Sequence, residues 1–204
     1  MFNILKSLNY QNIRSKSLLA ARQLHKQPKP IPVAWRRPEI GWTKLNFDGS
    51  SKGDKAPGLA SIGGVLRDHK AQFLLGYAEA IGRANSAMAE LTALTKGLEL
   101  VLENGWKDVW VEGDDKGLVE ILADNKEVKC VETRSYFRYI KSLILDLDNC
   151  KVSHIYREGN KVADRFASIG HRYKKLEIWR ELPPLETLDM MRHDAEGKIT
   201  FRRP

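Results

Sequence analysis

The sequence predicts a mixed α/β sheet in which three antiparallel strands are extended by parallel strands and flanked by helices. Two observations carry this prediction: apolar residues alternate with period two before residue 82, and they recur at helical spacing after residue 86. Strands joined by a hairpin pair antiparallel, whereas strands separated by a helical crossover pair in parallel. At 204 residues the chain has room for one such domain with short tails.

Three strands are expected first. The segment 44–48 alternates, which puts Leu45 and Phe47 on one face and Asp48 on the other. A Gly- and Ser-rich loop follows, and the next two runs form a hairpin that turns at residues 68–70. The predicted hairpin strands are 60–67 and 73–81.

Helical spacing begins beyond Ser86. Asn85 or Ser86 can cap a long helix that carries Leu91, Leu94 and Leu98, and Asn104 with Gly105 ends it. The remaining predicted elements are, in order, a strand at 109–112, helices at 116–123 and 133–147, a strand at 151–156, and a helix that Asn160 caps and Gly170 ends.

The net charge of +8 is concentrated at the start of the chain. The first 38 residues contain eight Lys and Arg residues and no acid, while the other 26 basic residues equal the 26 acidic ones in number. Such an arm suits a polyanion, because neutralising phosphates releases condensed counterions; a solvated linker is the equal alternative. We therefore expect a basic, flexible arm at 1–40, with a short helix at 13–24, a domain at 41–172 and a C-terminal extension at 173–204.

The cysteines and the hydropathy point to an intracellular, soluble protein. Cys130 and Cys150 are isolated from each other and from zinc-ligand spacing, which favours reduced thiols. No run approaches the apolar length of a membrane span. Nucleus or cytoplasm is favoured, and an organelle transit peptide is the alternative reading of the acid-free arm.

Four acids occupy element ends in this arrangement: Asp48, Glu90, Asp114 and Asp164. Neighbouring parallel strands bring Asp48 and Asp114 to one edge, and two helix starts can add Glu90 and Asp164. Four carboxylates at short range need a counter-cation, and Mg²⁺ or Mn²⁺ prefers such oxygens. Taken singly, each acid could instead be an ordinary helix-start or turn carboxylate.

Five ordered motifs between about Trp42 and Gly170 resemble the plant-type ribonuclease H-like domain found in non-LTR retroelement polyproteins. They are Lys44-Leu45-Asn46-Phe47-Asp48-Gly49-Ser50, Gly63-Gly64-Val65-Leu66-Arg67-Asp68, Ala89-Glu90-Leu91-Thr92-Ala93-Leu94, Val111-Glu112-Gly113-Asp114 and Arg157-Glu158-Gly159-Asn160-Lys161-Val162-Ala163-Asp164. The resemblance implies the ribonuclease H-like fold with a five-stranded mixed sheet. It also implies endonucleolytic cleavage of the RNA strand of RNA–DNA hybrids with two Mg²⁺ ions, with Mn²⁺ as the alternative metal and double-stranded RNA as the alternative substrate. We expect a monomer.

The resemblance also assigns roles. Asp48, Glu90, Asp114 and Asp164 become the catalytic metal ligands, with Asp48 touching both ions. The implied contacts to the minor groove and 2′-hydroxyls are Gly49, Ser50, Asn85 and Ser86. Separately, the guanidinium of Arg157 is a candidate for contact with phosphate.

Three departures from the family pattern leave a second function open. The loop before Asp164 is short and lacks a histidine, His154 being upstream in a strand, and Asp115 adds negative charge beside Asp114. A separate basic, Trp-bearing handle is also missing. A catalytically weak or inactive hybrid- or RNA-binding module is therefore the alternative to a ribonuclease.

Overall fold

The computed structural model of the chain describes residues 29–53, 57–124, 126, 128 and 130–203. Two units are distinguished by their internal packing, residues 1–31 with 201–204, and Pro32–Thr200. The predicted helix at 13–24 lies outside the described residues. The second unit contains all the elements that position the candidate site.

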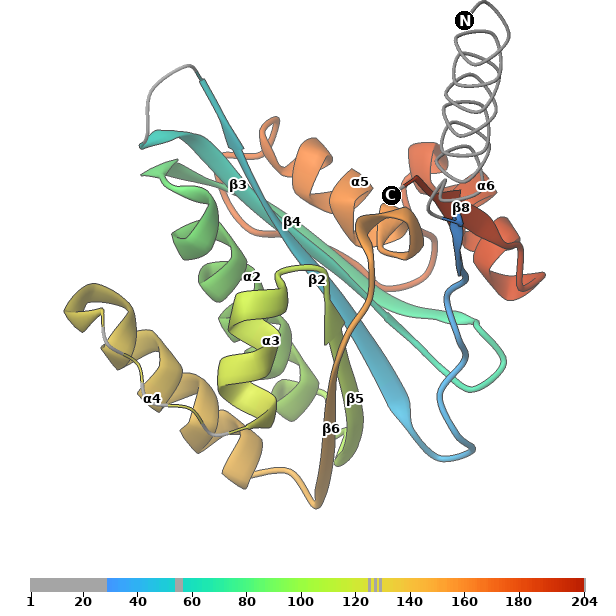
Figure 1. Cartoon of the computed structure of the whole chain (residues 1–204), viewed down its shortest axis with the longest axis horizontal. Helices are drawn as coiled ribbons and strands as arrows, with labels where there is room; N and C mark the ends of the chain where they lie inside the picture. Colours follow the sequence, from blue (N-terminus) through green and yellow to red (C-terminus); the bar gives the residue numbers. More distant parts are fainter. Residues whose placement is uncertain (1–28, 54–56, 125, 127, 129, 204) are drawn as a thin grey trace, which may run out of the picture. The chain divides into compact units, whose positions relative to one another are not determined.

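A six-stranded mixed sheet forms the centre of this unit, in the order β6-β5-β2-β3-β4-β7 (Figure 1). β2, β3, β4 and β7 pair antiparallel, while β5 pairs parallel with both β2 and β6. The strands are β2 (Thr43–Lys52), β3 (Gly58–Arg67), β4 (Phe73–Ala84), β5 (Asp108–Gly113), β6 (Asn149–His154) and β7 (Glu177–Trp179). Two short strands, β1 (Ile31–Val33) and β8 (Thr200–Arg202), form a separate sheet.

Helices cover both faces of the large sheet. α2, α3 and α4 lie on one side and α5 on the other (Figure 1). The helices are α2 (Ser86–Glu103), α3 (Lys116–Ala123), α4 (Val131–Leu145), the 3₁₀ turn η1 (Arg157–Gly159), α5 (Lys161–Gly170) and α6 (Leu185–Ala195). Among the described residues, no helix has the length and apolar character to cross a bilayer.

The alternation of β2 divides its residues between two environments. Leu45 and Phe47 are buried in the main core beneath α2 and α4. Lys44, Asn46 and Asp48 face the other way and are also buried. A strand with polar side chains on a buried face needs hydrogen-bond partners for each of them, and this requirement shapes the site described below.

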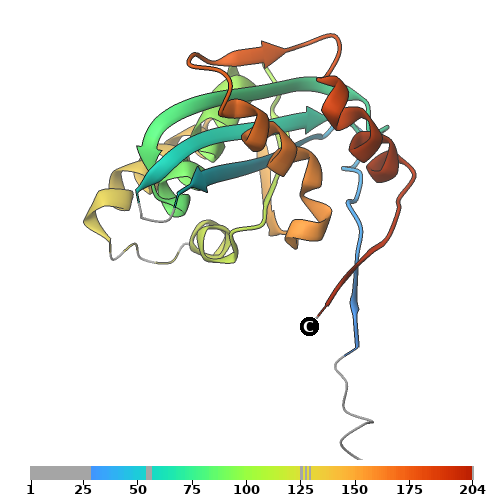
Figure 2. The ribbon, with the colours of Figure 1, turned by 90° about the horizontal axis from the view of Figure 1, so that it is seen from above.

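The predicted fold class is confirmed, with differences in extent. The sheet has a sixth strand because β7 pairs with β4. In Figure 2 this edge strand is the orange-red arrow at the top. β2 continues to Lys52, so Asp48 lies in mid-strand instead of closing it. Glu90 is the fifth residue of α2, so it lies in the second turn and not the first.

Candidate metal centre

Three of the four predicted carboxylates come together at the carboxyl end of β5. Oxygen atoms of Asp48, Glu90 and Asp114 all lie within 4.8 Å of one another. Asp48 and Glu90 are buried, and Asp114 is half-buried. Three carboxylates from three separate elements therefore share one small volume.

Strand register and a close helix contact produce this convergence. β2 and β5 run parallel with Asn46 opposite Glu112, so Asp48 and Asp114 follow two residues later at the same level of the two strands. Gly49 allows α2 to approach β2, because a Cβ there would lie 2.3 Å from the backbone nitrogen of Glu90. The absence of a side chain at residue 49 thus places Glu90 beside Asp48.

In the absence of metal, burial and mutual repulsion raise the pKa values of these acids. Burial first, and then the charge of Asp114, raises the pKa of Asp48 to about 8. Burial and the charge of Asp48 raise the pKa of Glu90 well above its ordinary value, and burial raises that of Asp114. A cluster in this state binds a cation more tightly as it loses protons.

The raised pKa values predict that the metal-free protein loses stability as pH rises from 5 to 7. A carboxyl whose folded-state pKa exceeds its unfolded value stabilises the fold while protonated, and this contribution is lost as pH rises toward the folded pKa. The expected slope is up to about 1.4 kcal/mol per pH unit for each proton concerned. Lys44, whose pKa burial lowers to about 8, titrates above this window.

Urea unfolding in EDTA at pH 5, 6 and 7 measures this slope. Asp48→Asn should make it shallower, and millimolar Mg²⁺ should stabilise the wild-type protein more at pH 7 than at pH 5. Equal slopes for the wild-type protein and the variant would contradict the assigned cause.

Asp164 lies close to the three acids but is engaged by an arginine. Its Oδ1 accepts from Nε of Arg157 at 3.1 Å and also forms an ion pair with the same guanidinium. The charge of Asp164 still contributes to the raised pKa of Asp48, so the fourth carboxylate borders the cluster. Arg157 and Asp164, with Glu158 and Lys161, line a cavity of about 250 Å³.

The donor set fits a hard divalent cation. Oε2 of Glu90 is buried and has no hydrogen-bond partner among the described residues. A buried carboxylate oxygen without a donor is unfavourable unless a proton or a cation satisfies it. The all-oxygen character of the set favours Mg²⁺ or Mn²⁺ over zinc. The residues present therefore fit the predicted metal.

The predicted substrate residues have differing local roles. Gly49 is a packing position, as described above. Ser50 places its Oγ 3.1 Å from Nε2 of His171. Asn85 and Ser86 are exposed at the start of α2, where Oδ1 of Asn85 accepts from the backbone N–H of Met88. Contact of these residues with a nucleic acid stays a prediction.

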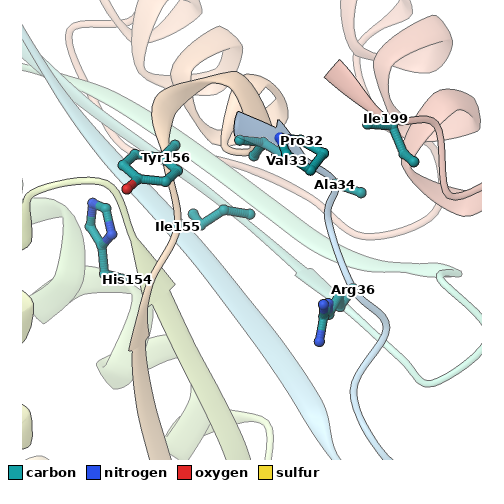
Figure 3. A pocket seen from close by; sticks show the side chains of 8 residues that line it. All are labelled: Pro32, Val33, Ala34, Arg36, His154, Ile155, Tyr156 and Ile199. Atoms are coloured by element: carbon teal, nitrogen blue, oxygen red, sulfur yellow. The ribbon is translucent and has the colours of Figure 1, made fainter. Parts of the chain in front are cut away.

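Two departures noted in the sequence acquire local explanations. The Asp115 carboxylate caps α3 by accepting from the backbone N–H of Leu118 at 2.9 Å. It is a minor cause of the raised pKa of Glu90, so its charge acts on the cluster from a distance. His154 lies at the end of β6 with its ring edge-on to Tyr156. Both residues line a pocket of about 430 Å³ together with Pro32, Val33, Ala34 and Arg36 (Figure 3).

Sequence reasoning missed the roles of Asn160 and Asn46. Asn160 was predicted to cap α5, but its side chain makes no capping bond. Its Nδ2 instead donates to the carbonyl of Phe47 at 2.9 Å and to Oδ1 of Asp114 at 3.3 Å. Asn46, buried on the Asp48 face of β2, donates in turn to Oδ1 of Asn160 at 3.4 Å. The Arg-Glu-Gly-Asn motif drew attention to Asn160, but the frequency of asparagine at helix starts favoured a capping role for it.

Fold and cluster together define a ribonuclease H-like domain with an acidic centre. Among solved structures, the ribonuclease H1 of the archaeon Halobacterium salinarum is 27% identical, with a TM-score of 0.60, and the match covers 63% of this chain and 96% of that one. LC11-RNase H1, solved in complex with an RNA/DNA hybrid, is 27% identical with a TM-score of 0.59, over 64% of this chain and 96% of that one.

The chain belongs to the reverse transcriptase-like family, whose model matches residues 46–170. A curated Arabidopsis thaliana protein named "Putative ribonuclease H protein" is 31% identical over 172 residues, which is 84% of this chain. The chain spans 27% of the length of that relative. The predicted resemblance is therefore confirmed.

Proposed function

We propose that this protein is a metal-dependent endoribonuclease that hydrolyses the RNA strand of RNA–DNA hybrids. The convergence of Asp48, Glu90 and Asp114 within 4.8 Å is the observation that carries the proposal. Similarity to ribonuclease H1 structures, one of them bound to an RNA/DNA hybrid, supports the substrate class. Two Mg²⁺ or Mn²⁺ ions held by the carboxylates would stabilise the attacking and leaving oxygens of an in-line displacement at phosphorus.

The residues of the site have distinct roles in the proposed reaction. Asp48 is the proposed central ligand, because its carboxyl interacts with those of Glu90, Asp114 and Asp164. Asp164 completes the acidic set from the first turn of α5. The Arg157 side chain is 73% exposed and can exchange one anionic partner, Asp164, for a phosphate oxygen of the substrate.

The start of α2 and the residues after Asp48 are the proposed contacts to the minor groove. The cap of α2 uses Oδ1 of Asn85 and does not use its Nδ2, which is a donor suited to a 2′-hydroxyl or a base edge. Ser50 and Ser86 supply hydroxyls that donate and accept. We further propose that the basic residues before Glu39 increase affinity for the hybrid in a salt-dependent manner.

The direct test is cleavage of a labelled hybrid. We expect the purified protein to nick the RNA strand with Mg²⁺ or Mn²⁺, to stop when EDTA is added, and to leave single-stranded DNA intact. RNA products should carry 5′-phosphates. Cleavage that is indifferent to EDTA would contradict the proposal.

One observation favours a hybrid-binding module as the second candidate. The Arg157 guanidinium is paired with Asp164, so a protein cation already balances the fourth carboxylate. Salt-sensitive, saturable binding of the hybrid without cleavage, at high protein concentration and in Mn²⁺, would identify this function instead.

A further inference from the structure

A chain of buried hydrogen bonds leads from Trp35 to the Asp114 carboxylate. Nε1 of Trp35 donates to Oδ1 of Asn46 at 2.7 Å, and Arg67 donates to the same oxygen at 2.9 Å. Nδ2 of Asn46 then donates to Asn160, whose own Nδ2 donates to Asp114. Trp35, Asn46, Arg67 and Asn160 are each at most 3% exposed. These hydrogen-bonded side chains are therefore largely shielded from water.

The chain has one direction, because its first members can only donate. An indole N–H and a guanidinium offer no acceptor, so the oxygen of the Asn46 amide must face Trp35 and Arg67. The Asn46 nitrogen is thereby turned toward Glu112, at 3.1 Å, and toward Asn160. Trp35 and Arg67 thus fix the orientation of the Asn46 amide.

The orientation of Asn46 in turn fixes that of Asn160. Because the Asn160 oxygen accepts from Asn46, its nitrogen faces the Phe47 carbonyl and the Asp114 carboxylate. A rotated Asn160 amide would place its oxygen against these two acceptors, which is repulsive in a buried setting. One amide group therefore links the backbone beside Asp48 to the side chain of Asp114.

We propose that Asn46 and Asn160 are positioning residues for Asp114, and that Trp35 sets their orientation from outside the segment that matches the family. The family model begins at residue 46, whereas Trp35 precedes it and is 3% exposed. The inference rests on the proposed function in that Asp114 is taken as a metal ligand. On this proposal the segment around Trp35 is part of the metal site and not only a linker.

Arg67, at the end of the hydrogen-bond chain that is remote from Asp114, is itself held by two contacts. Arg67 stacks on the Trp35 ring, 3.7 Å from its centroid, and pairs with Asp194 of α6 at 2.7 Å. Asp194 also lies beyond the family-matched segment. The orientation of Asn46 thus depends on residues on both sides of that segment: Trp35, which precedes it and donates to Asn46, and Asp194, which follows it and pairs with Arg67.

Trp35→Phe removes the indole N–H and keeps an aromatic ring for Arg67 to stack on. In metal-free protein, nuclear magnetic resonance should show that the side-chain amide protons of Asn160 exchange with solvent at least about tenfold faster in the variant. Mn²⁺ affinity, measured by calorimetry, and kcat for hybrid cleavage should each fall about five- to tenfold, the scale of one hydrogen bond, while KM changes little. Trp106→Phe is the matched control, since Trp106 packs on the main core.

Unchanged Asn160 amide signals in Trp35→Phe would overturn the proposal, and so would changes of equal size in Trp106→Phe. If Trp35→Phe does not fold, the wild-type protein supplies the test. Its Asn160 amide protons should be protected from exchange, and exchange at the rate of exposed asparagine amides overturns the inference. A protein that shows the amide and Mn²⁺ effects but never cleaves a hybrid would refute the proposed function alone.

Discussion

Asp48→Asn is expected to reduce cleavage of an RNA–DNA hybrid by about a thousandfold or more without unfolding the protein. The amide has nearly the shape of the carboxylate but lacks its charge, and charge stabilisation by a bound metal contributes several kcal/mol to such a reaction. In metal-free protein Asp48 must either hold a proton or repel its neighbours, so a neutral amide at this position should leave the fold at least as stable. Initial rates with excess hybrid in Mg²⁺, beside urea unfolding in EDTA, measure both effects.

Asp189→Asn provides the matched control for this change. Asp189 lies on α6 with its side chain 78% exposed and forms an ion pair with Arg192. The same chemical substitution there should leave cleavage within about twofold, because exposed ion pairs contribute little. Full activity in Asp48→Asn would remove the basis for a metal-dependent mechanism.

Gly49→Ala is expected to lower the free energy of unfolding by about 3 kcal/mol or more and to reduce cleavage at least about a hundredfold. An added Cβ would lie 2.3 Å from the backbone carbon of Ala89 and 2.3 Å from the nitrogen of Glu90. Because these are main-chain atoms, α2 itself must move, and Glu90 moves with it. Urea unfolding and hybrid cleavage measure the two losses.

This prediction separates a packing role for Gly49 from a role in substrate contact alone. Gly117→Ala is the control, since a methyl group there meets only the Asp115 carboxylate, at 3.3 Å. We expect its stability to change by no more than about 1 kcal/mol, the helix-propensity difference between the two residues. Weaker hybrid binding in Gly49→Ala with unchanged stability would show that substrate contact, and not packing, requires the glycine.

Regular periodicity made most of the fold predictable. The helix at 116–123 was predicted with its observed bounds, and the sequence motifs located the three acids that converge. The strand β7 was missed because three residues, Glu177–Trp179, are too short to show alternation. Its formation depends on the open edge of β4, which is a tertiary property.

Buried polar residues were the least predictable part of the site. Trp35 lies among prolines and arginines, a composition typical of a linker, yet it is buried against Arg67 and Asn46. Asn160 directly precedes a helix, a position that favours a capping role. Its side chain instead donates to the carbonyl of Phe47 and the carboxylate of Asp114. Local rules describe what a residue can do, while such partners are supplied by distant segments of the chain.

The location of Mn²⁺ in crystals of the metal-soaked protein tests the central claim most directly. Anomalous difference maps should show density for the ion within coordination distance of carboxylate oxygens of Asp48, Glu90 and Asp114, and this density should be lost in Asp48→Asn. Saturating Mn²⁺ that leaves these three side chains without density, or that binds only elsewhere on the protein, would contradict the account.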